Sequence, residues 1–222
     1  MTRREGATSD KHALHAPAMR RRRSPLYPDP DPGEVVWDRF EDHLKAGRLL
    51  ARRYYLDEAV HAESARTFRA WTDAMLGRST DAITVVINSP GGEVVAGLDI
   101  VSQIRSLQRA GIEVRGHVVG DAASMGAVIL AACSVRSMTS LSRLMWHGIV
   151  SAAFGDATDM RSQQKELDRM TATIAAILTA TAAPGTRFAN RAWVRKTMSE
   201  KRPIWIYPEE ALASGLVDEV VE

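Results

Sequence analysis

The chain has 222 residues, of which 45% are hydrophobic and 25% are charged, and its formal net charge is +2. These values suit one soluble globular domain large enough to bury a core, and the small net charge favours neither a nucleic-acid nor a membrane partner. The single cysteine, Cys133, excludes an internal disulfide and a cysteine-based metal cluster. No apolar run approaches the ~20 residues that span a bilayer. The N-terminus also lacks the apolar core of a secretory signal, so we expect a cytoplasmic protein. We expect neither a metal nor a cofactor.

The first 33 residues differ in composition from the rest of the chain. They contain four consecutive arginines, Arg20–Arg23, and five prolines up to Pro32. A segment of this kind has little surface to bury, so we predict a disordered basic tail over residues 1–33 and one domain over 34–222. The arginine run could contact nucleic acid, but a solvated tail is the favoured interpretation.

From Val35 onward, strand patterns alternate with helix patterns. Strands are predicted at 53–60, 82–88, 112–120, 143–147, 204–207 and 216–221, and helices at 63–76, 94–111, 124–132, 158–183 and 208–215, with a shorter helix before 204. Strands that alternate with helices pair in parallel through crossovers, which predicts an α/β fold. In the long helix, Met160, Leu167 and Ile174 recur every seven residues, a spacing that suits packing against another helix and indicates a subunit interface.

The segment GDAASMGAVIL places Ser124 at the start of a buried helix among small residues. The start of a helix presents unpaired amide N–H groups and a partial positive charge, which stabilise the anionic oxygen formed in acyl transfer. Ser124 is therefore a candidate nucleophile. The alternative is an ordinary serine that caps the helix with its side chain.

Two further segments could complete a hydrolytic site. The turn SPGG, residues 89–92, could direct the Gly92 amide into a cleft, where it would form an oxyanion hole with the Met125 amide. Taken alone, SPGG is simply a tight turn. His147 ends the predicted strand RLMWH and could act as the base that a serine nucleophile requires, although a lone histidine at a strand end is often structural. His61 and His117 could also be bases, but no motif places them.

Taken in order, these segments resemble the Clp protease proteolytic subunit (ClpP) family, which are serine peptidases of the crotonase-like fold. The resemblance covers about residues 38–221 and rests on INSPGG, GLDI, GDAASMGAVILAA, RLMWH, FGDATDM and EEALASGLVD. It implies that Ser124 is the nucleophile, that His147 is the base, and that Gly92 and Met125 supply the oxyanion-hole amides.

The resemblance also implies an architecture and partners. The expected fold is a spiral of βαβ units with a protruding handle helix, which in this family joins two stacked rings. The expected partners are a Clp-family ATPase, unfolded-protein substrates, and other subunits in a homomeric or mixed ring. The chain has no phosphate-binding loop of its own, which agrees with ATP being used by a partner.

The chain departs from the family at the third residue of the catalytic triad, which is an aspartate in the family. Counting back from Gly215 puts Pro203 in that position, within SEKRPIWIYPEEA. Loss of the carboxylate lowers activity without abolishing it, and Glu200 could fold back into the role.

Three hypotheses therefore remain. The first is an active serine endopeptidase that works with an unfoldase, and the second is a catalytically impaired subunit that assembles with active ones. The third, an acyl-CoA enzyme of the crotonase type, is disfavoured because it gives no reason for a serine at the start of the helix.

Overall fold

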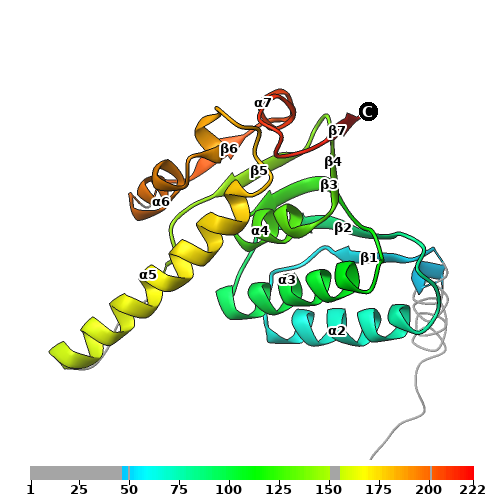
Figure 1. Ribbon diagram of the computed structural model, residues 1–222, viewed down its shortest axis with the longest axis horizontal. Helices are drawn as coiled ribbons and strands as arrows, with labels where there is room; N and C mark the ends of the chain where they lie inside the picture. Colours follow the sequence, from blue (N-terminus) through cyan, green and yellow to red (C-terminus); the bar gives the residue numbers. More distant parts are fainter. Residues whose placement is uncertain (1–46, 50, 151–155, 201) are drawn as a thin grey trace, which may run out of the picture. The chain divides into compact units, whose positions relative to one another are not determined.

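The computed structural model describes residues 47–49, 51–150, 156–200 and 202–222. All of these belong to one compact unit, residues 44–222, shown as a ribbon in Figure 1. The tail predicted over residues 1–33 and its boundary lie outside the described residues, so both stay predictions.

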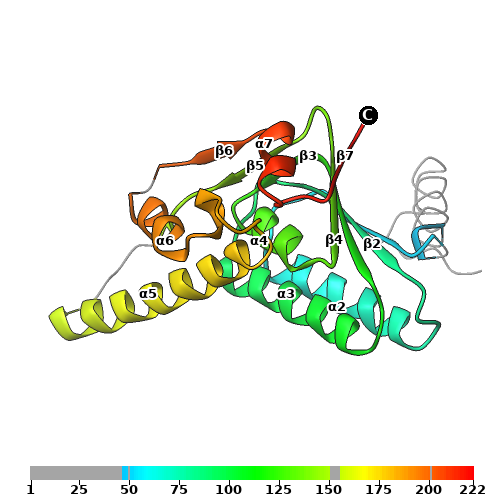
Figure 2. The ribbon, with the colours of Figure 1, turned by 45° about the horizontal axis from the view of Figure 1, so that its top comes forward.

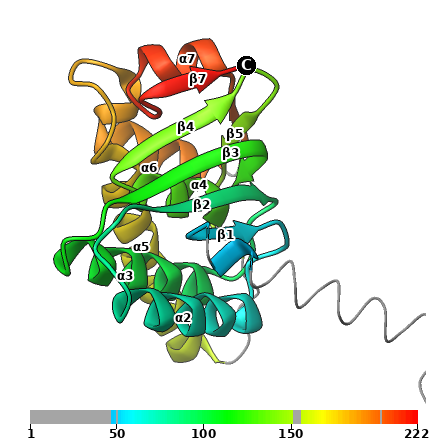
Figure 3. The same cartoon turned by 90° about the vertical axis from the view of Figure 1, so that its right-hand side faces the viewer.

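A parallel sheet forms the centre of this unit (Figure 3). Its strands lie side by side in the order β1, β2, β3, β4 and β7, and each pairs in parallel with its neighbours. Their bounds are Arg53–Leu56, Ile83–Ser89, Val114–Ala123, Val135–Thr139 and Glu219–Val221. The apolar side chains that alternate along β2 and β3 are fully buried, as expected for strands whose inner face is covered by helices.

Three helices lie on the same side of this sheet (Figure 2). They are α2 (Ala62–Leu76), α3 (Val94–Arg109) and α4 (Met125–Ala132), and α3 contacts both of the others. The apolar face of each helix is buried, with Phe68 in α2, Ile104 in α3 and Ile129 in α4 among the fully covered side chains. The α/β fold expected from the alternating pattern is thus confirmed.

Two features of the sheet differ from the prediction. Strand β4 was missed because its sequence, VRSMT, alternates without the apolar run that marks a central strand. The pairing is also not wholly parallel: β3 extends past β4 to pair with β5 (Arg143–Trp146), and β5 pairs in antiparallel with β6 (Ile204–Ile206). This antiparallel pair decides which residues lie opposite the end of β5.

The remaining helices extend from the sheet. Helix α5 (Ala157–Thr179) protrudes from the rest of the unit in Figure 1, and the short helices η1 (Arg187–Ala189), α6 (Arg191–Ser199) and α7 (Pro208–Ala213) follow it. Helix α5 ends four residues earlier than predicted. Only its C-terminal half packs on the core, through Ile174 and its neighbours, whereas Met160 near its start is 50% exposed. Within the described ranges, no helix combines the length and the apolar character required to cross a membrane.

The last strand is attached to the sheet by an ion pair between the buried Arg136 and Asp218, whose own side chain is 44% exposed. The Arg136 side chain on β4 is only 10% exposed, and its guanidinium donates to both carboxylate oxygens of Asp218, at 2.6 and 3.2 Å. Asp218 also accepts from the Arg136 backbone N–H, at 2.8 Å. A buried cation is costly without its partner, so this contact contributes to stability well beyond a surface ion pair.

We expect Asp218→Asn to lower the free energy of unfolding by about 2 kcal/mol, because it leaves a buried guanidinium without its counter-charge. The matched control is Glu210→Gln, which removes the partner of Arg187 from an exposed pair and should cost less than about 1 kcal/mol. Urea unfolding at fixed protein concentration measures both values. Equal losses for the two variants would show that burial of Arg136 adds nothing to the strength of its ion pair with Asp218.

Candidate active site

Ser124 lies at the turn between β3 and α4, and its backbone is strained. Its φ of 51° and ψ of −116° form a conformation that residues with a side chain rarely adopt, at a cost of about 1–3 kcal/mol. The Ser124 N–H donates to the Met145 carbonyl on β5 at 2.7 Å, which holds the turn against the sheet. The hydroxyl makes no capping hydrogen bond to α4. The alternative of an ordinary capping serine is therefore wrong.

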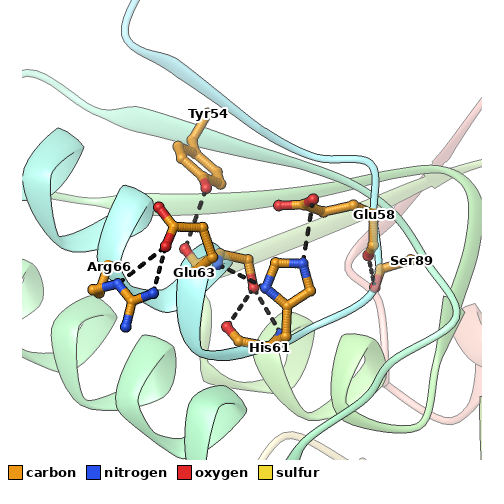
Figure 4. Close-up of polar contacts among 7 residues, drawn as sticks. Tyr54, Glu58, His61, Glu63, Arg66 and Ser89 are labelled. Carbon is orange, nitrogen blue, oxygen red and sulfur yellow. Dashed lines mark hydrogen bonds and ion pairs between the residues drawn. The ribbon is translucent and has the colours of Figure 1, made fainter.

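The SPGG turn at the end of β2 lies directly against Ser124. A Cβ added to Gly91 would lie 2.6 Å from the Ser124 Cβ and 2.8 Å from the Met125 nitrogen, closer than real Cβ atoms come. Gly91 also has a φ of 87°, which favours glycine. Ser89 supports the turn, because its Oγ accepts from the Gly91 N–H at 3.2 Å and donates to the Glu58 carbonyl at 2.6 Å (Figure 4).

Two backbone amides at these turns are the candidates for the oxyanion hole. Gly92 forms a parallel bridge with Val60 in which the hydrogen bonds use the Gly91 carbonyl and the Glu93 N–H. In such a bridge the N–H of Gly92 itself points to the opposite side. The Met125 N–H belongs to the first residue of α4, where amides have no partner within the helix.

His147 follows the last residue of β5, and its ring is oriented by the backbone. Its Nδ1 lies 2.6 Å from the Gly148 carbonyl oxygen. A carbonyl only accepts hydrogen bonds, so Nδ1 carries the proton and, in the neutral ring, Nε2 is left as an acceptor. A side chain at Gly148 would collide with the Met198 carbonyl at the end of α6, so this loop packs closely on that helix.

Ser124, His147, Gly92 and Met125 all line one cavity of about 360 Å³. The structure thus brings together the four residues predicted as the site. The contacts among the described residues do not include a hydrogen bond between Ser124 Oγ and the imidazole, although both side chains are partly exposed in the cavity wall. The other lining residues are mainly apolar: Pro90, Gly91, Glu93, Val94, Val128, Trp146, Gly148, Ile149, Val150, Ile174 and Met198.

Sequence reasoning missed several of these lining residues. Ile174 comes from α5 and Met198 from α6, and no local pattern indicates that these helices reach the cavity. Glu93 could have been noticed, because it directly follows the SPGG turn. Within the described part of the chain, no group of three or more His, Cys, Asp or Glu side chains is placed to hold a metal ion.

The position opposite His147 carries no carboxylate. In the antiparallel pair, Trp146 lies opposite Ile204, and continuing the register by one residue places His147 opposite Pro203. Glu200 ends α6, where it lies 4.0 Å from Lys196 Nζ. No hydrogen bond or ion pair joins a carboxylate to His147 among the residues described.

The other candidate histidines have different roles. Figure 4 shows His61 at the start of α2, where its Nδ1 accepts from the Ser64 N–H at 3.1 Å and caps the helix. The His117 Nδ1 lies 2.8 Å from Ser137 Oγ, and burial together with nearby Arg53 lowers the pKa of His117. Neither residue lines the cavity. Cys133 is buried, and burial raises the pKa of its thiol to about 12.

Comparisons with known proteins identify the family to which the chain belongs. The family model described as Clp protease matches residues 45–222, so the chain belongs to that family. Among solved structures, a point mutant of ClpP1 from Listeria monocytogenes is similar with a TM-score of 0.68 and 25% identity, over 81% of this chain and 96% of that one. The crotonase-like α/β fold is thereby confirmed.

Individual relatives carry the same family name. ATP-dependent Clp protease proteolytic subunit 2 of Chlamydia muridarum is 35% identical over 146 residues, which are 64% of this chain and 66% of that protein. ATP-dependent Clp protease proteolytic subunit 1 of Streptomyces avermitilis is 30% identical over 202 residues, which are 89% of this chain and 88% of that protein. The chain therefore matches about two thirds of the length of the chlamydial relative and most of the streptomycete one.

The strain at Ser124 leads to a stability prediction. Ser124→Gly should be more stable than Ser124→Ala, because relief of about 1–3 kcal/mol of backbone strain exceeds the roughly 0.4–1 kcal/mol that glycine loses through greater freedom in the unfolded chain. Both variants lack the hydroxyl, so the comparison isolates the effect of the backbone conformation at residue 124 on stability. Thermal melts measure the difference, and an alanine variant that melts at the higher temperature would show that the backbone at residue 124 is relaxed.

Proposed function

We propose that the chain is a serine endopeptidase subunit of a Clp-type, ATPase-coupled protein-degradation complex. The observation that carries this proposal is the geometry of Ser124. Its hydroxyl is withheld from helix capping by a strained backbone and lines the same cavity as His147. Strain of this kind persists where the surrounding structure enforces it, and it is concentrated at functional sites.

The proposed reaction is acyl transfer to Ser124 followed by hydrolysis. Nε2 of His147 removes the proton from Ser124 Oγ while Oγ attacks the scissile peptide carbonyl. The N–H groups of Gly92 and Met125 donate to the oxyanion of the tetrahedral intermediate. The protonated His147 then gives its proton to the leaving amine, the peptide C–N bond breaks, and a water activated by the same ring hydrolyses the ester.

The Gly148 carbonyl takes the orienting role in place of the missing aspartate. It holds the Nδ1–H at 2.6 Å and thereby selects the tautomer that leaves Nε2 free to accept a proton. A carbonyl carries only a partial negative charge, so it stabilises the imidazolium less than a carboxylate does. We infer an active site that works as a Ser–His dyad, with a lower rate than a complete triad would give.

A specific observation also favours the second candidate function, that of a catalytically impaired subunit. Pro203 stands opposite His147 in the strand register, where it can neither accept a proton nor orient the ring. In that case the chain would contribute structure to a mixed ring whose activity comes from other subunits. The acyl-CoA alternative remains disfavoured, because it leaves the strain at Ser124 unexplained.

The proposed assembly is a ring of subunits in the cytoplasm that joins a second ring through α5. The exposed N-terminal half of α5 supports this arrangement, because it presents the apolar Met160, which is 50% exposed. The relatives named as ATP-dependent Clp protease subunits support a Clp-family ATPase as the partner that delivers unfolded protein.

An active-site-directed fluorophosphonate should label the wild-type protein but not Ser124→Ala, because only an activated serine attacks the phosphorus atom. Ser102→Ala removes an exposed hydroxyl from α3 and should label like the wild type. In-gel fluorescence with a tagged probe measures both. Labelling that persists in Ser124→Ala would assign the reactive hydroxyl to another residue, and absence of labelling in the wild type would favour the impaired subunit.

Pro203→Asp should increase peptidase activity, because it places a carboxylate opposite His147. A triad carboxylate can be worth about 10⁴ in kcat, and we expect at least a tenfold gain because the ring must turn from Gly148 to reach the new partner. Pro203→Asn is the control with a similar shape and no charge. Hydrolysis of a fluorogenic peptide measures kcat. Equal rates for the two variants would show that residue 203 does not occupy the position of the third triad residue.

The wild-type protein should sediment as a large ring assembly rather than as a monomer. Met160→Asp should shift the distribution toward smaller species, because it places a charge on the exposed apolar side of α5. Ser162→Asp adds the same charge to a position that is already polar and should leave the assembly intact. Sedimentation velocity distinguishes these outcomes, and a wild-type monomer at all concentrations would exclude the proposed ring.

A further inference from the structure

The lining of the cavity that contains Ser124 and His147 includes one acidic residue, Glu93. Of the residues that line it, only His147 and Glu93 are ionisable, and the walls are otherwise apolar or small. Glu93 is therefore the one carboxylate residue in the described lining of the cavity.

The Glu93 carboxylate is not engaged within the described chain. Its backbone N–H donates to the Val60 carbonyl at 2.8 Å, which holds the residue beside Gly92. It occupies the position that caps α3, but its side chain makes no capping hydrogen bond. The side chain is exposed, and no hydrogen bond or ion pair joins its carboxylate to another described residue. A structural role in the isolated subunit therefore does not explain the charge.

Its neighbours in the cavity indicate what the carboxylate could bind. The walls formed by Val94, Ile174 and Met198 suit an aliphatic stem, and the carboxylate suits a cationic group at the end of such a stem. Lysine and arginine are the amino acids with both parts. A volume of about 360 Å³ leaves room for one long side chain beside the reacting backbone.

We propose that Glu93 is a specificity-determining residue that favours a lysine or arginine immediately before the scissile bond. This inference rests on the proposed peptidase function, since the cavity is the one that Ser124 lines. Because Ser124 and His147 are both part of the cavity wall, we assign the entering side chain to the residue whose carbonyl Ser124 attacks. An acidic residue at the same position is disfavoured by repulsion from Glu93.

The test compares two fluorogenic peptides that differ only in the residue before the cut, which is lysine in one and norleucine in the other. Both have the same aliphatic stem, so the ratio of their kcat/KM values reports on the ammonium group. We expect Glu93→Gln to lower the lysine-to-norleucine ratio about tenfold, as a charge-assisted contact predicts. The control Glu209→Gln removes a carboxylate from the start of α7, away from the cavity, and should leave the ratio unchanged.

Binding provides a second readout that does not require catalysis. In the Ser124→Ala background, fluorescence anisotropy should show the lysine peptide binding more tightly than the norleucine peptide, and Glu93→Gln should remove this preference. Equal preference with and without the Glu93 carboxylate in both assays would overturn the inference. A charge-dependent preference in binding together with no cleavage and no fluorophosphonate labelling would retain the inference about Glu93 while rejecting the active peptidase.

Discussion

The close approach of two turns is the constraint on which the rest of the site depends. Strands β2 and β3 are parallel neighbours, so the turns at their carboxyl ends emerge at the same edge of the sheet. Gly91 in one turn approaches Ser124 in the other so closely that any side chain on the glycine would collide with the serine. The strained backbone at Ser124 and the amides of Gly92 and Met125 are positioned by this contact.

The second determinant is the antiparallel addition of β6 to β5. This pair places a residue from the end of the chain opposite His147, and here that residue is Pro203. The imidazole is oriented by the adjacent Gly148 carbonyl, in a loop pressed against α6. In the proposed mechanism the carbonyl selects the tautomer, whereas no carboxylate among the described residues contacts the ring to stabilise the imidazolium.

Helix α5 links the site to the surface proposed for assembly. Its C-terminal half is buried and supplies Ile174 to the cavity, whereas its N-terminal half extends away from the sheet, as Figure 1 shows. The same helix therefore contributes both to the cavity wall and to the exposed surface.

The sequence by itself determined the order and type of most elements, and it indicated four candidate site residues that the structure places around one cavity. Apolar β-branched runs and helical periodicity indicate which faces of the elements are buried. The small residues of SPGG and GDAASMG allow backbone conformations and close contacts that few other segments permit. Only the tertiary structure decided that Ser124 does not cap its helix, that β4 lies within the sheet, and that Glu93 shares a cavity with Ile174 and Met198. The physical reason is that local patterns report burial along one segment, whereas strand partners and cavity walls arise from the packing of segments far apart in the chain.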